Sequence, residues 1–315
     1  MAKRKKGPTP RRHSPQLPSS EGRVNYILES VTLDQIVRDK AYHEAVRKFW
    51  WRFYSELAYQ RAQIVDELRS ALSRNVRRDF QFDHWQRAAR WKYSLHPLCT
   101  LGSVKYGGGR FNVGEIDPSR FTAFQALYLA ENKGTALQEA LGQAALPHRG
   151  LTPSEIALTN PQSEVIVSIS GMLEEVIDLT HPTSLQEFVN LVGSLKVSPS
   201  LLREAAKINF DTTRIRSTSN IDELLGSLLA PNWRQFPQMV DLPSSSQVFG
   251  ELVRSARIGG VLYPSKLNKK KCLAIFPSNF KGTSSFLTLD DEPPTSSVVS
   301  RIDSSNWEIC ERVIG

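Results

Sequence analysis

YGGGRFNVG, residues 106–114, places three glycines directly before Arg110. Glycine adopts backbone conformations that other residues avoid and lets a ligand approach the main chain closely. Arginine presents a planar fork of donors that matches a phosphate group. Two interpretations follow, the tip of a surface hairpin or a loop that holds an anionic ligand. The stretch is not a P-loop, because it lacks the lysine and the serine or threonine of that motif, and no GxGxxG occurs in the chain.

The basic charge of the chain is concentrated at its start. The net charge is +8, but six of the 40 lysines and arginines lie in the first 20 residues, which hold no acidic residue. The other 295 residues carry 34 basic and 32 acidic side chains, so they offer no general attraction for nucleic acid. Residues 1–22 are rich in proline, serine and basic residues and are predicted to form a disordered tail. A solvated terminus and a contact with an acidic partner or nucleic acid both remain open for it.

Cysteine, histidine and hydropathy patterns exclude several classes of protein. The six histidines do not cluster, and HExxH is absent, so no metal site is expected. No run of about 18 apolar residues occurs, and no apolar segment follows the basic start, so neither a membrane span nor a secretory signal is expected. A reducing cytoplasm is predicted, because the three cysteines are far apart, odd in number and without a CxxC pair: Cys99, Cys272 and Cys310.

Residues 30–94 are predicted to be helical. Thr32 and Gln35 fit a capping box, and apolar residues recur at helical spacing from Val46 to Leu72 without an interrupting glycine or proline. A second helix is predicted over residues 79–92, packed back on the first. Four aromatic residues in the first helix could stack on bases, but polar residues occupy the opposite face, which favours a packed seam between helices: Trp50, Trp51, Phe53 and Tyr54.

Beyond Leu95 the pattern changes to short strands mixed with helices. Residues 164–170 alternate between apolar and polar, and the apolar runs 257–265 and 272–278 flank a lysine-rich turn, which predicts a hairpin. Without a regular alternation of strand and helix, the prediction is an α+β fold. Helices are expected at 133–144, 183–195, 199–207, 220–229 and 246–256. The predicted domains are a basic tail (1–22), a helical region (23–94), a catalytic domain (95–285) and a C-terminal extension (286–315).

Four short segments carry side chains suited to one chemistry: GGGRFN (107–112), ALYLAE (126–131), TALQEAL (135–141) and GVLYPS (260–265). Arg110 can bind a phosphate, and Tyr128 can stack on a ring. Glu139 can accept a ribose hydroxyl and stabilise an oxocarbenium-like sugar, while Ser265 can donate to a phosphate. Together they suit cleavage of an N-glycosidic bond in an anionic nucleotide. Each also has a structural explanation, as a turn anchor, a core residue, a solvated charge or a turn residue.

In their order, and with EVIDLTHP (175–182), these segments resemble the RES domain, over roughly residues 95–280. The resemblance implies an ADP-ribosyltransferase-like fold with a mixed β core. It also implies degradation of NAD⁺, in which phosphate or water attacks the nicotinamide ribose. NAD⁺ would be the substrate, so no cofactor is expected, and inorganic phosphate is a candidate co-substrate. RES domains are best known as bacterial toxins paired with Xre-type antitoxins. Such an antitoxin is therefore the expected partner, while a homo-oligomer stays open.

The resemblance also implies an active-site set of Arg110, Tyr128, Glu139 and Ser265. Arg110 would bind the NAD⁺ phosphates or the nicotinamide ribose, Tyr128 would pack on the nicotinamide side, and Glu139 would stabilise the ribosyl cation. Ser265 would hold phosphate or ribose. Further substrate contacts are expected from Gly108, Gly109, Asn112 and Lys92.

Many family members carry an early arginine on the first strand of the domain. Here that strand is predicted at residues 91–98; Arg90 lies just upstream of it, and Lys92 is the weaker substitute within it. The interval from Arg110 to Tyr128 is 18 residues, so residues 115–122 are expected to loop out. Two alternatives remain open, an ADP-ribosyltransferase that modifies a macromolecule and a non-catalytic nucleic-acid- or partner-binding protein with a decayed RES domain.

Overall fold

The computed structural model describes residues 33–141, 164–293, 295 and 298–312. The predicted tail, residues 1–22, and the predicted capping residue Thr32 lie outside these ranges. The chain divides into two units, Met1–Glu44 and Ala45–Gly315. The described part of the first unit is the beginning of helix α2 (Leu33–Gln63), and the second unit carries the rest of α2, the sheet and all predicted site residues.

The helical prediction for residues 30–94 is confirmed for its first part only. Helix α2 is followed by α3 (Val65–Ser73). Within the second unit, Phe49 of α2 is buried against α7 (Pro199–Lys207), and its ring lies edge-on to Phe210 at 5.4 Å between centroids. Trp51 stacks on Phe121 at 6.0 Å. These contacts agree with the predicted seam of packed aromatic residues. Rings that are packed in this way are not free to stack on bases.

Residues 79–92 do not form the predicted helix, because residues 79–90 belong to strand β1 (Arg77–Arg90). This strand pairs antiparallel with β5 (Glu164–Asp178), and its register shifts between Phe82 and Trp85, where His84 has a positive φ of 57°. The bulge places both aromatic rings in the same core cluster although they are three residues apart. That spacing imitates the period of a helix, which explains the error. The strand predicted at residues 91–98 is also wrong, since a 3₁₀ turn begins at Trp91.

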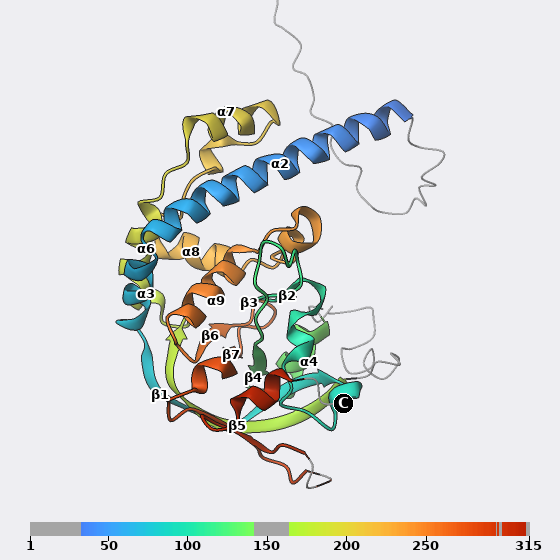
Figure 1. The fold of residues 1–315 in the computed structure, drawn as a ribbon, viewed down its shortest axis with the longest axis vertical. Helices are drawn as coiled ribbons and strands as arrows, with labels where there is room; N and C mark the ends of the chain where they lie inside the picture. The colour runs from blue at the N-terminus through green and yellow to red at the C-terminus, as the bar shows by residue number, and fades with distance from the viewer. Residues whose placement is uncertain (1–32, 142–163, 294, 296–297, 313–315) are drawn as a thin grey trace, which may run out of the picture. The chain divides into compact units, whose positions relative to one another are not determined.

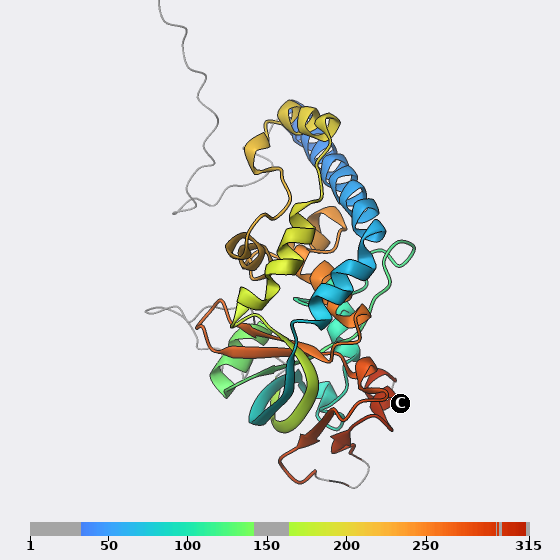
Figure 2. The same cartoon turned by 90° about the vertical axis from the view of Figure 1, so that its left-hand side faces the viewer.

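The main sheet has seven strands in the order β1-β4-β7-β6-β5-β8-β9. β1 pairs with both β4 and β5, so five of the strands close into a ring (Figure 2). The predicted hairpin is confirmed by the antiparallel pairing of β6 and β7. The sheet takes strands from both sides of the predicted catalytic range, 95–285. The other strands of this sheet are β4 (Leu127–Ala130), β6 (Gly260–Pro264), β7 (Lys271–Ile275), β8 (Phe286–Leu289) and β9 (Arg301–Ile302).

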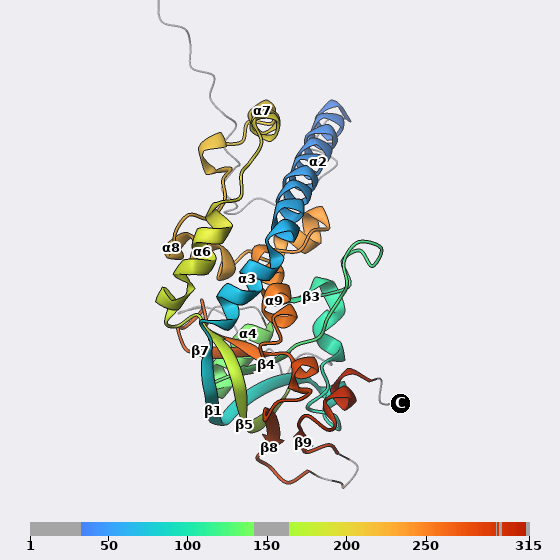
Figure 3. The same ribbon diagram turned by 60° about the vertical axis from the view of Figure 1, so that its left-hand side comes forward.

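The described part of the chain combines one mixed sheet with separate helices, which confirms the α+β prediction. Helices α3, α6, α8 and α9 gather on one side of the ring of strands, and the part of the sheet formed by β8 and β9 lies on the other side with the C-terminal 3₁₀ turn (Figures 1 and 3). The helices predicted after Leu95 are all present, although residues 142–144 of the first lie outside the described ranges. They are α4 (Lys133–Leu141), α6 (Gln186–Gly193), α7, α8 (Ile221–Leu228) and α9 (Ser245–Ser255).

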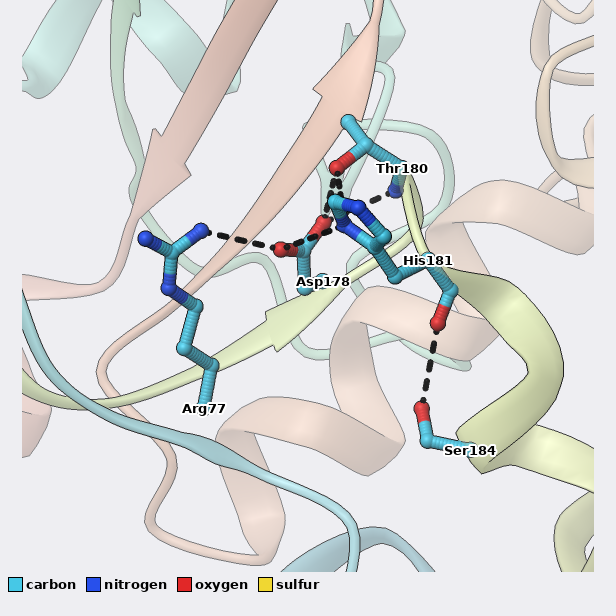
Figure 4. Close-up of polar contacts among 5 residues, drawn as sticks. All are labelled: Arg77, Asp178, Thr180, His181 and Ser184. Atoms are coloured by element: carbon cyan, nitrogen blue, oxygen red, sulfur yellow. Dashed lines mark hydrogen bonds and ion pairs between the residues drawn. The ribbon is translucent and has the colours of Figure 1, made fainter.

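The EVIDLTHP segment ends β5 in a network of hydrogen bonds around Asp178 (Figure 4). The buried carboxylate accepts from Thr180 N at 2.9 Å, from Thr180 Oγ1 at 2.5 Å and from Arg77 Nη1 at 3.2 Å. The His181 ring lies 3.4 Å away. Burial alone would raise the pKa of Asp178, but the hydrogen bonds outweigh it and lower the pKa. The network ties the end of β5 to the beginning of β1.

Among the residues that the structure describes, no helix is long and apolar enough to cross a membrane. Cys99, Cys272 and Cys310 are buried free thiols.

Candidate active site

The glycine-rich stretch forms a small hairpin that is also part of a cavity wall. Strands β2 (Gly108–Gly109) and β3 (Asn112–Val113) pair directly, so Arg110 and Phe111 make the turn. Gly108 has a φ of 95°, and a Cβ there would lie 2.3 Å from the Asn112 carbonyl oxygen. A Cβ on Gly109 would lie 2.4 Å from the Tyr128 hydroxyl. These glycines therefore allow the hairpin to pack closely against other parts of the protein, Asn112 and Tyr128.

Helix α9 holds this hairpin in place through Gln247 (Figure 1). Its fully buried Nε2 donates to the carbonyls of Gly107 at 2.7 Å, Asn112 at 3.0 Å and Gly109 at 3.1 Å. Its Oε1 accepts from Ser244 N at 3.0 Å and completes the capping box that begins α9. One side chain thus fixes both the start of a helix and the path of the loop that carries Arg110.

Asn112 stabilises the loop rather than facing the cavity. Its Oδ1 accepts from Gly109 N at 3.0 Å and from Tyr128 Oη at 2.8 Å. Its Nδ2 donates to the carbonyls of Ser103 and Phe124 at 3.0 and 2.8 Å. An amide has two donor hydrogens and two acceptor positions, and these contacts use them all. The Asn112 side chain therefore has no free hydrogen-bonding group for the predicted contact with substrate.

Arg110 is 9% exposed and anchored at the end of helix α8. Its Nη1 donates to the carbonyl of Ala230 at 2.9 Å and to that of Leu228 at 3.4 Å. A cation is favoured there, because the last carbonyls of a helix lack partners and carry partial negative charge. The guanidinium also lies 5.7 Å from the centre of the Trp233 ring. These contacts fix the position of the cation without neutralising it.

Tyr128 projects from strand β4 toward the hairpin. Its hydroxyl accepts from Phe111 N at 2.9 Å and donates to Asn112. Burial raises the pKa of Tyr128 far above its ordinary value. The phenol therefore stays protonated near neutral pH and cannot serve as a base; it offers a ring face and a fixed dipole.

Glu139 and Ser265 meet although 126 residues separate them. Glu139 lies on α4, which begins after Asn132, where the Asn132 side chain accepts from Thr135 N at 2.9 Å. Ser265 follows β6, is fully buried and donates to Glu139 Oε1 at 2.6 Å. Asn268, in the same β-turn as Ser265, donates to Thr135 Oγ1 at 2.8 Å. The turn and the helix are thus joined, and the carboxylate orientation is fixed.

Arg110, Tyr128, Glu139 and Gly109 line one cavity of about 200 Å³, while Ser265 lies behind Glu139. Lys92 is exposed, contacts the Tyr93 ring at 4.9 Å and is not among the lining residues. Strand β1 contributes Gln86 and Ala88 to the wall, and no basic residue of β1 lines the cavity. The prediction did not include several other lining residues: Gln86, Ala88, Trp233, Arg234, Tyr263 and Cys272.

The charged side chains that line the cavity favour an anionic ligand, and they include one carboxylate that can take part in a reaction. Burial raises the pKa of Tyr263 and of Cys272, so both groups stay neutral. Glu139 is the acidic side chain among the described lining residues, and it faces two arginines. A second cavity of about 210 Å³ between α2, α6, α8 and α9 is mainly apolar and contains none of the predicted site residues.

Comparisons with known proteins were made for sequence and fold. The sequence model of the RES domain family matches residues 83–294. Among solved structures, the chain is similar to one from the crystal structure of the M. tuberculosis MbcT-MbcA toxin-antitoxin complex. That alignment has 14% sequence identity and a TM-score of 0.41, and covers 78% of this chain and 94% of the other. No curated protein matches the chain.

Proposed function

The chain belongs to the RES domain family, and from this premise we propose that it is an enzyme that breaks the nicotinamide–ribose bond of NAD⁺. The observation that carries the proposal is the gathering of Arg110, Tyr128 and Glu139 around one cavity, with Ser265 bonded to the Glu139 carboxylate. An anionic nucleotide whose nicotinamide ring is cationic requires three groups for binding and cleavage: a cation, an aromatic ring and an oriented carboxylate.

In the proposed reaction the bond from C1′ of ribose to the nicotinamide nitrogen breaks, and its electron pair leaves with nicotinamide. Positive charge then develops on the ribose, and the Glu139 carboxylate stabilises that charge through a sugar hydroxyl. Ser265 donates to one carboxylate oxygen and leaves the other for the ribose. Arg110 holds the anionic part of the substrate, and the Tyr128 ring packs beside the nicotinamide.

The attacking oxygen belongs to inorganic phosphate or to water. Attack by phosphate forms a bond from phosphate oxygen to C1′ and gives ADP-ribose phosphate. Attack by water gives ADP-ribose and releases a proton to solvent. Both routes release nicotinamide and use the same carboxylate. They are therefore distinguished by the other product, ADP-ribose phosphate or ADP-ribose.

The proposal is tested by incubating the purified protein with NAD⁺, with and without inorganic phosphate. Nicotinamide release is measured by chromatography and the other product by phosphorus NMR. We expect release by the wild type and a loss of about a hundredfold or more in Glu139→Gln. Glu67→Gln, which changes an exposed carboxylate on α3, is the matched control and should keep full activity. Undiminished release by Glu139→Gln, or ADP-ribose transferred to a macromolecule, would refute the proposal.

We further propose that the enzyme is a bacterial toxin neutralised by an Xre-type antitoxin, acting in the cytoplasm. Family membership supports the toxin role, and the buried free thiols suit a reducing compartment. Induced expression in a bacterial host should arrest growth and lower cellular NAD⁺, and Glu139→Gln should relieve both effects. Co-expression of an Xre-like protein encoded beside this chain should restore growth and co-purify with it. Continued growth with undepleted NAD⁺ would contradict the toxin role.

A further inference from the structure

The segment between α8 and α9 brings a tryptophan and an arginine into the cavity wall. Trp233 is 5% exposed, and Arg234 has an exposed side chain. Both line the cavity with Arg110 and Glu139. The carbonyls that bind Arg110 lie where this segment begins, on Leu228 at the end of α8 and on Ala230. The position of Arg110 and the path of the chain toward Trp233 are therefore coupled.

Both arginines contact the same indole. The guanidinium carbon of Arg110 lies 5.7 Å from the centre of the Trp233 ring, and that of Arg234 lies 4.6 Å from it. The electron-rich face of an indole attracts a cation, so the ring can hold both groups near it. Within the described part of the chain, neither guanidinium forms an ion pair with a carboxylate. Two cations without a direct ion pair thus share one cavity with a single described carboxylate, that of Glu139.

The charge of Arg110 acts on Arg234. Partial burial and the positive charge of Arg110 lower the pKa of the Arg234 guanidinium, while the nearby Glu139 raises it. Hydrogen bonds to the carbonyls of Leu228 and Ala230 explain the position of Arg110, whereas among the described residues no side-chain hydrogen bond holds Arg234. An anion between or beside the two groups would remove their repulsion.

We propose that Arg110 and Arg234, spaced by Trp233, form a two-cation clamp for the diphosphate of a dinucleotide. The inference rests on the proposed function and adds to it a residue, Arg234, that selects the substrate. Guanidinium groups bind phosphate oxygens in pairs, and a diphosphate offers two adjacent phosphates to two such groups. Glu139 in the same wall then lies on the ribose side of that diphosphate. The clamp favours NAD⁺ over nicotinamide riboside, which has the same scissile bond and no phosphate.

Kinetic measurements on three substrates test the clamp: NAD⁺, nicotinamide mononucleotide and nicotinamide riboside. Arg234→Ala should raise KM for NAD⁺ by about tenfold to a hundredfold with little change in kcat, because it removes charge-assisted hydrogen bonds to the ligand. Cleavage of nicotinamide riboside should stay unchanged, and Arg234→Lys should restore part of the loss. Arg203→Ala, at an exposed position on α7, is the matched control. An equal loss on NAD⁺ and riboside, or no loss on NAD⁺, would overturn the clamp.

Binding of ADP-ribose, measured by calorimetry, tests the clamp without catalysis. We expect Arg234→Ala to weaken binding of ADP-ribose by about tenfold or more and to leave adenosine binding unchanged. Equal affinity of wild type and Arg234→Ala for ADP-ribose, or no binding by the wild type, would refute the clamp. Failure of the proposed function has a different signature, which is the absence of nicotinamide release from NAD⁺ by the wild type.

Discussion

The replacement Gln247→Met measures how strongly α9 fixes the hairpin that carries Arg110. Gln247 is fully buried, and its Nε2 faces three carbonyls at 2.7–3.1 Å. An amide nitrogen carries two hydrogens, so the three acceptors share two full hydrogen bonds. Methionine has a similar volume and helix propensity but no donor. Each buried carbonyl left unpaired costs about 1–3 kcal/mol, and loss of the capping contact adds about 1 kcal/mol. For two lost hydrogen bonds and the capping contact, we expect a total destabilisation of about 3–7 kcal/mol.

The assay is equilibrium unfolding in urea, followed by tryptophan fluorescence, with nicotinamide release measured on the same samples. Asn220→Ala is the matched control, because it removes an exposed N-cap from α8 and nothing from the hairpin. Its expected cost is about 1 kcal/mol. Gln247→Met should also lower the rate of NAD⁺ cleavage under conditions where it is folded, while Asn220→Ala should not. The reasoning is refuted if Gln247→Met destabilises the protein no more than Asn220→Ala does.

Three further predictions concern the site and the sheet. Gly109→Ala should abolish NAD⁺ cleavage and lower the melting temperature, because its Cβ would lie 2.4 Å from a tyrosine hydroxyl; Gly226→Ala, where nothing lies within 4 Å, should leave activity intact. Asp178→Asn should cost about 1–3 kcal/mol in unfolding experiments at pH 7. Since the folded pKa of Asp178 is lowered, its contribution is complete above about pH 4 and disappears as the pH falls through the folded value, so the mutant should show a flatter acid limb. Ser265→Ala should lower kcat about tenfold to a hundredfold with little change in KM, because the carboxylate of Glu139 loses the donor that orients it; a change in KM alone would contradict this.

The helices after Leu95 and the hairpin of β6 and β7 were predicted correctly, because turns and clear periodicity mark them, whereas β8 and β9 were not predicted. The prediction failed at β1, where the bulge at His84 converts a period of two into a helix-like interval between Phe82 and Trp85. A bulge is selected by pairing with a distant strand, here β5, and local sequence does not record that partner. The predicted role of Lys92 depended on the misplaced strand and lost its structural basis with it.

Motifs located most of the candidate site, but not its second arginine, Arg234. Arg110, Tyr128 and Glu139 were found because each stands in a recognisable segment, and all three line the cavity. Trp233 and Arg234 lie more than 100 residues beyond Arg110, in a segment without a motif or a period. The anchoring of Arg110 on the carbonyls after α8 brings that segment to the cavity. Such tertiary contacts have no signal in one sequence.

The closed ring of strands has a consequence for the order in which the protein can form. β7 lies between β4 and β6 in the sheet but is the last of the three to be synthesised. β1 likewise pairs with β5, which is synthesised much later. Most pairings thus join distant parts of the chain, and proteins with such pairings fold slowly. A growing or truncated chain that lacks β7 therefore has no strand to join β4, which carries Tyr128, to β6, which precedes Ser265. The proposed activity therefore requires translation to have passed β7, which ends at Ile275.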